Sequence, residues 1–338
     1  MEGITNRLAV AAGAVGLVVL AAGCGGNAAT TAGTHPSTAA AAPRALPNPF
    51  TVTARYTAKS LGLTHPDDLA VGPDGNLYVT DFSQRVTVIS PAGKILRRWG
   101  KPGSRPGEFR FIPFEPTVPM DVSGAIAVGS NGMVYVSDSG NARVQVFTPQ
   151  GRFVRQFGSF GSGKGQFLDP SGVAADNAGN VYVDDGQSEN ISKFSPGGKL
   201  IWQIGGASGD PDLIGHHHFS GFDAHGRLVM VNDDVQKIIY VDAAGHKVDV
   251  FSPASASFAG GNACEATVDA VGNAYVSGCG PDLTGPTLVY DRAHQLIAKW
   301  PGTEYNLLKS PVFGPKGEVF ALTTQRSVIR LHITLPGA

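Results

Sequence analysis

Histidines and carboxylates of this sequence are spaced so that they could bind a metal ion. Three consecutive histidines, His216 to His218, lie in the second half of the chain, and His65 lies in the first. Imidazoles beside carboxylates bind zinc and other divalent ions. Because successive side chains of a strand point to opposite faces, His216 and His218 could share a site that His217 could not join. We therefore treat His65, His216 and His218 as candidate ligands of zinc or calcium, with a hydrogen-bonded or solvent-facing histidine cluster as the alternative.

The sequence contains neither the common catalytic and nucleotide-binding motifs nor a cluster of basic residues. The chain contains no Gly-x-Ser-x-Gly elbow, no P-loop and no His-Glu-x-x-His motif. Its formal net charge is −1, and its lysines and arginines are scattered rather than clustered. Nucleic acids are recognised by concentrated basic surfaces, so we expect no nucleic-acid partner. Apart from the divalent ion, we predict no cofactor.

A tight turn that contains glycine and leads into a short apolar run occurs six times in the chain. The turn glycines are Gly75, Gly132, Gly179, Gly226, Gly272 and Gly317, at intervals of 57, 47, 47, 46 and 45 residues. Glycine relieves the positive-φ strain of a tight hairpin turn. An insertion rich in Pro and Phe, Arg105 to Pro119, accounts for the long first interval. Such regular spacing predicts a repeat architecture.

Each repeat contains four short strand-like runs. In the second repeat, for example, the apolar runs at 144–147 and 153–157 are joined by a Pro/Gly turn at 148–151. Runs that are nearly all apolar are typical of strands buried on both faces, as in a propeller blade packed between two neighbours. We therefore expect four antiparallel strands in each unit.

Two stretches of the chain resemble a known repeat family. The sequence PSGVAADNAGNVYV at 170–183 resembles the opening half of an NHL repeat, and DSGNARVQVF at 138–147, followed by Gly151 and Gly158, resembles the second half. The resemblance extends over residues 50 to 338 and implies a β-propeller. Six units then imply an all-β fold, a six-bladed β-propeller of four-stranded antiparallel blades.

The two ends of the repeat region predict how the ring closes. The sixth unit has no clear fourth strand after residues 327–331, while an alternating strand at 50–58 precedes the first unit. We expect this N-terminal strand to become the outer strand of the last blade, because that arrangement leaves no open sheet at the junction.

Counting back from each turn glycine aligns the starts of the six innermost strands, where propellers bind ligands. The positions aligned with Gly172 are Asp68, Ala125, Gly172, Phe219, Glu265 and Ser310, and those one residue earlier are Asp67, Gly124, Ser171, His218, Cys264 and Lys309. Polar groups at a channel mouth are candidate ligand contacts. The candidates are Asp67, Asp68, His218, Glu265 and Lys309, with hydrated rim residues as the alternative reading.

A catalytic role is the less favoured alternative for the same residues. Some NHL-type propellers are peptide-amidating lyases whose zinc is held by three histidines from separate strands. Here the slots that match His65 and His216 hold Val122, Asp169, Asn262 and Leu308, so the third histidine is missing. We do not transfer that activity, but Asp68, His218 and Glu265 remain candidate catalytic residues of a metal-dependent lyase or hydrolase.

The first 48 residues predict export and a lipid anchor. Residues 1–23 have the apolar stretch of a signal peptide and end just before Cys24, in a sequence that resembles a bacterial lipobox. Residues 24–48 are rich in Ala, Thr and Pro and predict a flexible tether before the propeller at 49–338. We expect lipid on Cys24 to hold the protein at the outer face of the cell membrane or in the cell envelope. An ordinary secretory signal with an incidental cysteine is the alternative.

The remaining cysteines, Cys264 and Cys279, lie at equal distances from the turn of the fifth unit. That spacing places them opposite each other on two antiparallel strands, close enough for a disulfide. Exported proteins meet oxidising conditions, which favours a structural bridge over a reactive thiol pair.

The sequence therefore favours a monomeric, non-enzymatic propeller at the cell surface. We expect it to bind a protein, peptide or glycan of the cell envelope. The inserted loop, with Phe109, Phe111 and Phe114, is its candidate contact surface, and a cover over a sheet edge is the alternative role for that loop.

Overall fold

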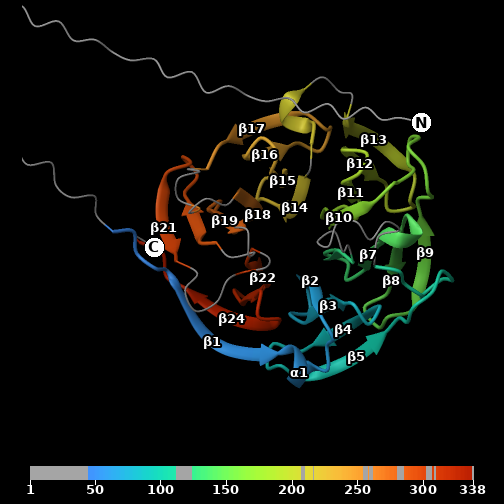
Figure 1. The fold of residues 1–338 in the computed structure, drawn as a ribbon, viewed down its shortest axis with the longest axis horizontal. Coiled ribbons are helices and arrows are strands. Elements are labelled where there is room, and N and C mark those ends of the chain that lie inside the picture. The colour runs from blue at the N-terminus through green and yellow to red at the C-terminus, as the bar shows by residue number, and fades with distance from the viewer. Residues whose placement is uncertain are drawn as a thin grey trace, which may run out of the picture. The chain divides into compact units, whose positions relative to one another are not determined.

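Six four-stranded antiparallel sheets surround a central channel (Figure 1). The computed structural model describes residues 45–111, 124–206, 210–215, 217–253, 258, 262–279, 285–301, 307 and 310–336. In five of the blades the strands follow one another from the channel outward, so the chain enters each of these blades at its innermost strand (Figure 1). In the remaining blade the outermost strand is the first strand of the chain. The predicted six-bladed all-β fold is confirmed.

The strands of the first three blades have the following bounds. Blade 1 contains β2 (Pro66–Val71), β3 (Leu77–Asp81), β4 (Arg85–Ile89) and β5 (Ile95–Trp99). Blade 2 contains β6 (Ile126–Val128), β7 (Val134–Asp138), β8 (Arg143–Phe147) and β9 (Phe153–Phe157). Blade 3 contains β10 (Pro170–Ala175), β11 (Val181–Asp185), β12 (Asn190–Phe194) and β13 (Leu200–Gly205).

The second half of the ring repeats this pattern. Blade 4 contains β14 (His217–Phe222), β15 (Leu228–Asn232), β16 (Lys237–Val241) and β17 (Lys247–Phe251). Blade 5 contains β18 (Asn262–Val268), β19 (Ala274–Cys279), β20 (Thr287–Tyr290) and β21 (Leu296–Trp300). Blade 6 contains β22 (Val312–Phe313), β23 (Val319–Leu322), β24 (Ser327–Ile333) and β1 (Phe50–Thr57). Short helical turns lie between strands at α1 (Ala58–Leu61), η1 (Ser139–Asn141) and η3 (Pro211–Leu213).

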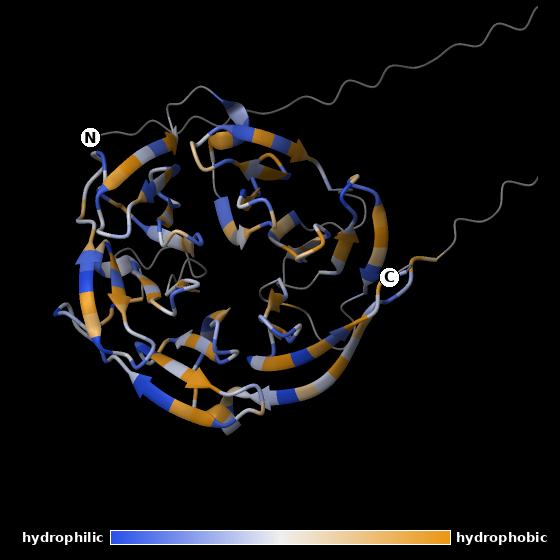
Figure 2. Ribbon diagram, turned by 180° about the vertical axis from the view of Figure 1, so that it is seen from behind, coloured by the Kyte–Doolittle hydropathy of each residue, from blue (hydrophilic) through white to orange (hydrophobic). Residues whose placement is uncertain are grey.

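Burial of the strands depends on their distance from the channel. Every residue of β3, β7, β11 and β15, the second strands of blades 1 to 4, is buried, because each blade packs between two others. The outer strands β5 and β17 alternate between half-buried and exposed residues, and β9 does so up to its buried last residue, Phe157. Figure 2 shows the same alternation of hydrophobic and hydrophilic residues on the outer strands. The core therefore lies between blades rather than at one centre.

In blades 1, 3, 4 and 5 the hairpin turn after the innermost strand is held by an aspartate side chain. In blade 3, Oδ1 of Asp176 accepts hydrogen bonds from the backbone N–H groups of Ala178 and Asn180, at 3.0 and 2.8 Å. Its Oδ2 accepts one from the hydroxyl of Tyr182 at 3.3 Å. Gly179 has a φ of 79°, the left-handed conformation that the sequence pattern requires of this position.

The N-terminal strand closes the ring as predicted. β1 pairs antiparallel with β24, from Phe50 opposite Ile333 to Thr57 opposite Ser327, and so becomes the outer strand of blade 6. At the same junction the ring of Phe50 packs on Trp300 of blade 5, with centroids 4.9 Å apart. Main-chain pairing therefore joins the two ends of the propeller, and the aromatic contact joins β1 to blade 5.

Five of the six outer strands also place an aromatic ring against the blade that follows. The ring covers the hairpin turn that joins the third and fourth strands of that blade. The pairs are Tyr56 over Gly93, Trp99 over Gly151, Phe157 over Gly198, Trp202 over Gly245 and Phe251 over His294. A Cβ on Gly151 would lie 2.6 Å from Cδ2 of Trp99. The rings therefore need a turn without a side chain, or one whose side chain can stack.

The start of the predicted insertion, residues 105–109, belongs to a loop that recurs in the next blade. Phe109 and Phe111 are fully buried against blades 1 and 2, so these two residues are not an exposed contact surface. Residues 100–109 instead repeat in 158–167: Pro102 bridges Phe109 just as Phe160 bridges Phe167. The predicted contact role is therefore wrong for these two side chains, and Phe114 lies outside the described residues.

Candidate functional site

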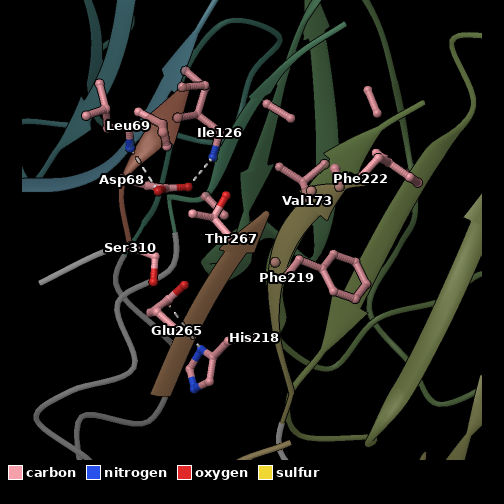
Figure 3. A pocket seen from close by; sticks show the side chains of 18 of the residues that line it. Asp68, Leu69, Ile126, Val173, His218, Phe219, Phe222, Glu265, Thr267 and Ser310 are labelled. Carbon is pink, nitrogen blue, oxygen red and sulfur yellow. Dashed lines mark hydrogen bonds and ion pairs between the residues drawn. The ribbon is translucent and has the colours of Figure 1, made fainter. Parts of the chain in front are cut away.

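A cavity of about 330 Å³ opens in the central channel. It is lined by the innermost strands of all six blades, β2, β6, β10, β14, β18 and β22. Ligand pockets in proteins span about 300 to 1,000 Å³, so the cavity could admit a small molecule or a single side chain. Figure 3 shows its lining, with Glu265 drawn between Ser310 and His218.

β-Bulges decide which side chains share one level of the channel. In β10 the register shifts between Pro170 and Gly172, and in β18 between Ala263 and Glu265, so Gly172 and Glu265 follow their bulges. In β14 the shift comes later, between Phe219 and Gly221. A bulge inserts one residue and re-aims the side chains beside it.

The late bulge of blade 4 moves His218 into the ring of aligned positions. His218 pairs with Val231, five residues after the turn glycine, as Glu265 pairs with Ser277 in blade 5. The sequence alignment predicted Phe219 at this position. The structure places His218 there instead, one residue earlier. His218 and Glu265 consequently lie at the same level on neighbouring blades.

His218 lies between two carboxylates. Its Nδ1 is 3.8 Å from Oε1 of Glu265 in blade 5, and its Nε2 is 3.7 Å from Oδ2 of Asp233, which follows β15 in its own blade. The imidazole is 29% exposed, whereas the Glu265 side chain is only 10% exposed. Both distances exceed that of an ordinary hydrogen bond. The arrangement could bind a cation or hydrogen-bond donor, or move a proton.

Asp67 and Asp68 join blade 1 to blade 2. Oδ2 of Asp67 accepts a hydrogen bond from the backbone N–H of Gly124 at 2.7 Å, and Oδ2 of Asp68 accepts one from that of Ile126 at 2.8 Å. Oδ1 of Asp68 accepts from the N–H of Leu69, also at 2.8 Å. Asp68 lines the cavity, whereas Asp67 is not among its lining residues. Both carboxylates therefore hold the inner strands in place, and Asp68 adds negative charge to the channel.

The three candidate metal ligands have different surroundings. His65 stacks on Phe82 with ring centroids 4.2 Å apart and is not among the residues that line the cavity. Burial, followed by the charge of Arg326, lowers the pKa of His65 from its ordinary value. His218 lines the cavity, and His216 lies outside the described residues. Across the described ranges, no group of three or more His, Cys, Asp or Glu side chains is placed to hold a metal ion.

A second histidine, His217, forms a buried polar group with blade 3. Its Nδ1 lies 3.8 Å from Oδ1 of Asp184, and Oδ2 of Asp184 accepts a hydrogen bond from the hydroxyl of Ser171 at 3.0 Å. The side chains of His217 and Asp184 are at most 1% exposed. His217 and His218 both line the cavity, but His217 lies beside Asp184 of blade 3 whereas His218 lies beside Glu265 of blade 5. Sequence reasoning did not find Asp184 or Asp233, whose only signal was their position at the end of a second strand.

The other predicted site residues remain predictions. Cys24 and Lys309 lie outside the described residues. The register opposes Asn262 and Cys279 and leaves Cys264 in the bulge of β18. Cys264 is a disulfide cysteine, but the side chain of Cys279 lies outside the described residues, so this pairing stays a prediction.

Comparison with known proteins supports the propeller fold. A family model described as a 6-bladed beta-propeller matches residues 108–202. Peptidylglycine alpha-amidating monooxygenase of Rattus norvegicus is 36% identical over 120 residues, which are 32% of this chain and 11% of that protein. RING finger protein nhl-1 of Caenorhabditis elegans is 36% identical over 77 residues, 23% of this chain and 7% of that protein. The chain thus spans only a small part of the curated relatives it matches.

Solved structures show the same architecture at low identity. Virginiamycin B lyase from Staphylococcus aureus, in a catalytically inactive form with quinupristin, aligns with a TM-score of 0.55 and 13% identity over 84% of this chain and 100% of that chain. A protein of unknown function from Bacteroides caccae aligns with a TM-score of 0.51 and 13% identity over 70% of this chain and 81% of that chain. At this identity the likeness shows the fold alone. This protein is a β-propeller.

Helices contribute little to the described part of the chain. Within that part, none is long and apolar enough to cross a bilayer.

Proposed function

We propose that the protein is a binding module that receives one group of its ligand at the mouth of the central channel. The proposal rests chiefly on one observation: His218 and Glu265, from neighbouring blades, meet at a cavity of about 330 Å³. Propellers host many functions, so the site rather than the fold carries the argument. A histidine between carboxylates offers both charge and hydrogen-bonding capacity to an incoming polar group. The ligand we propose is a protein, peptide or glycan of the cell envelope.

The proposed location follows from the N-terminal sequence. We infer an exported NHL-type propeller, anchored by lipid on Cys24 and monomeric, with a tether between the lipid and the folded part. Mass spectrometry of the protein isolated from membranes tests this location. A lipid-modified N-terminal peptide beginning at Cys24 is expected, whereas an unmodified Cys24 in a mature secreted protein would contradict the anchor.

Binding to arrays of cell-envelope glycans and peptides tests the ligand class. The purified protein is compared with the double variant His218→Ala, Glu265→Gln. We expect signals on one class of ligand that the double variant loses. Asp249→Asn is the matched control, because it removes a negative charge on the outer strand β17, away from the channel. Equal array binding by the protein and the double variant would reject a site at the channel mouth.

A lyase or hydrolase is the second candidate, favoured by the placement of His218 between Asp233 and Glu265. Such a histidine can act as a general base. Elemental mass spectrometry of the purified protein tests the metal-dependent form of this candidate. Quinupristin, present in the structure of virginiamycin B lyase, is a defined first substrate. A change in its chromatographic retention that His218→Ala abolishes would favour the enzyme over the binding module.

A further inference from the structure

The two ends of the cavity have opposite character. At the starts of the inner strands the lining includes Asp68, His218, Glu265 and Ser310. Further along the same strands, the lining contains only apolar residues at one level: Val71, Val128, Ala175, Phe222, Val268 and Phe313. Val268 comes three residues after Glu265 along β18, a distance of about 10 Å at the usual rise per residue. A ligand that fills the cavity therefore meets a polar level and an apolar level within its own length.

The polar level carries an excess of negative charge. The described residues that line the cavity include the carboxylates of Asp68 and Glu265 but no lysine or arginine. Asp233 adds a third carboxylate 3.7 Å from His218. Complementary charge between a site and its ligand selects the ligand and excludes those of like charge. The polar level thus favours a cation and disfavours a carboxylate or phosphate.

The apolar level favours an attached hydrocarbon group. Phe222 packs against Tyr182 with ring centroids 5.0 Å apart, and Phe313 packs against Tyr275 at 5.2 Å, so each ring is held against the blade that precedes its own. Preformed apolar walls bind without having to order themselves first. Each methylene removed from water contributes about 0.8 kcal/mol.

We propose that the cavity binds a primary ammonium group that carries an apolar chain or ring. The ammonium lies at the level of Glu265, and the apolar part extends along β18 toward Val268 and Phe313. This inference rests on the proposed function, because both place the ligand in the channel, and it names the chemistry of the group that is recognised. A free alkylamine and the N-terminal residue of a peptide with an apolar side chain share this chemistry.

Calorimetric titration of the full-length protein with hexylamine, hexanol and hexanoate tests the head group. We expect hexylamine to bind best and hexanoate not at all. Glu265→Gln should weaken hexylamine binding about tenfold, in keeping with the loss of a charge-assisted hydrogen bond, while leaving hexanol unchanged. Asp249→Asn removes the same charge outside the channel and should leave hexylamine binding unchanged.

Chain length tests the apolar level. Hexylamine should bind about tenfold more tightly than butylamine, because two more methylenes leave water. Val268→Thr, a nearly isosteric change, should reduce that ratio. Leucyl-glycyl-glycine and its N-acetylated form distinguish the two sources of the ammonium: tight binding of the free tripeptide alone indicates a peptide N-terminus, and preference for hexylamine indicates a free amine.

Three results would overturn the inference. They are hexanoate binding as well as hexylamine does, an affinity independent of chain length, and no binding by any of the three hexyl compounds. The proposed function is judged separately, by array signals lost in the His218→Ala, Glu265→Gln variant. A channel that binds an anionic or fully polar envelope ligand would uphold that function and reject the ammonium chemistry.

Discussion

The imidazole of His294 lies nearly parallel to the ring of Phe251, with centroids 4.2 Å apart and an angle of 17° between the planes. His294 occupies the turn position that glycine holds in blades 1 to 4, and its φ is 59°. An aromatic ring of the preceding blade therefore packs on bare backbone where the turn holds glycine, and on an imidazole where it holds His294. The contact between blades tolerates both, because each leaves a surface on which a ring can stack.

Replacement of Gly151 by alanine tests this contact. The new Cβ would lie 2.6 Å from Trp99, at a residue whose φ is 83°. We expect the free energy of unfolding to fall by more than the about 1–2 kcal/mol that left-handed backbone alone costs an L-residue. Gly226→Ala is the control, because its φ is 74° but no atom lies within 4 Å of the added Cβ. Equal losses in urea denaturation of the two variants would show that Trp99 does not press on the turn.

Alanine substitution of the phenylalanines in two equivalent loops should affect the free energy of unfolding very differently. Phe109 is fully buried, whereas Phe160 is 73% exposed. Phe109→Ala should lower the free energy of unfolding by about 3–5 kcal/mol, the usual cost of emptying an aromatic core site. Phe160→Ala should change it by less than about 0.5 kcal/mol. A small effect of Phe109→Ala in the same denaturation experiment would place the loop outside the core.

Removal of β1 should open blade 6. A chain of residues 60–338 lacks the strand that pairs with β24, so we expect a lower melting temperature and association through the exposed edge. A chain of residues 45–338 retains β1 and is the control. Thermal melting and size-exclusion chromatography with light scattering measure both effects. A stable monomer of 60–338 would refute the role of β1 in closure.

Acid should weaken the fold in part through His65. Its pKa is lowered in the folded protein, chiefly by burial, so the unfolded chain takes up a proton at higher pH than the native state does. Stability therefore falls as the pH drops through the ordinary value of 6.5 toward the folded pKa, and His65 has no further effect below that.

Substitution of His65 by phenylalanine keeps a ring on Phe82 and removes the titrating group. Urea midpoints between pH 8 and pH 5 should then depend less on pH than those of the unchanged protein. His225→Gln, at an exposed histidine, is the control and should leave the pH dependence as it was. An unchanged slope in the His65→Phe variant would contradict the role of burial.

The sequence was sufficient to predict the ring, because turn glycines such as Gly179 and buried runs such as Val181 to Asp185 recur at regular spacing. It also predicted closure by the strand at 50–58, which the structure has at Phe50–Thr57. Local turn chemistry and strand burial are encoded within a few residues, so they can be read without knowledge of the neighbouring blades.

The site was less predictable because it depends on the register of individual strands. The shift after Phe219 in β14 brings His218 level with Glu265, and no local pattern marked the position of that bulge. Asp233 reaches His218 from the turn after β15 in the same blade. Phe109 was misassigned because an aromatic residue in a Gly-rich loop looks exposed until the repeat of that loop at 158–167 is recognised.

Because β1 pairs with β24, the first and last strands of the chain meet inside one blade rather than between two blades. One sheet therefore joins segments about as far apart along the sequence as the propeller allows, and such non-local pairs form late in folding. Until β1 has paired with β24, the outer edge of β24 stays uncovered. A chain shortened at either end would thus show one common defect, an unpaired strand that proteases and other chains can reach. Blade 6 is therefore complete only in a chain that contains both terminal strands.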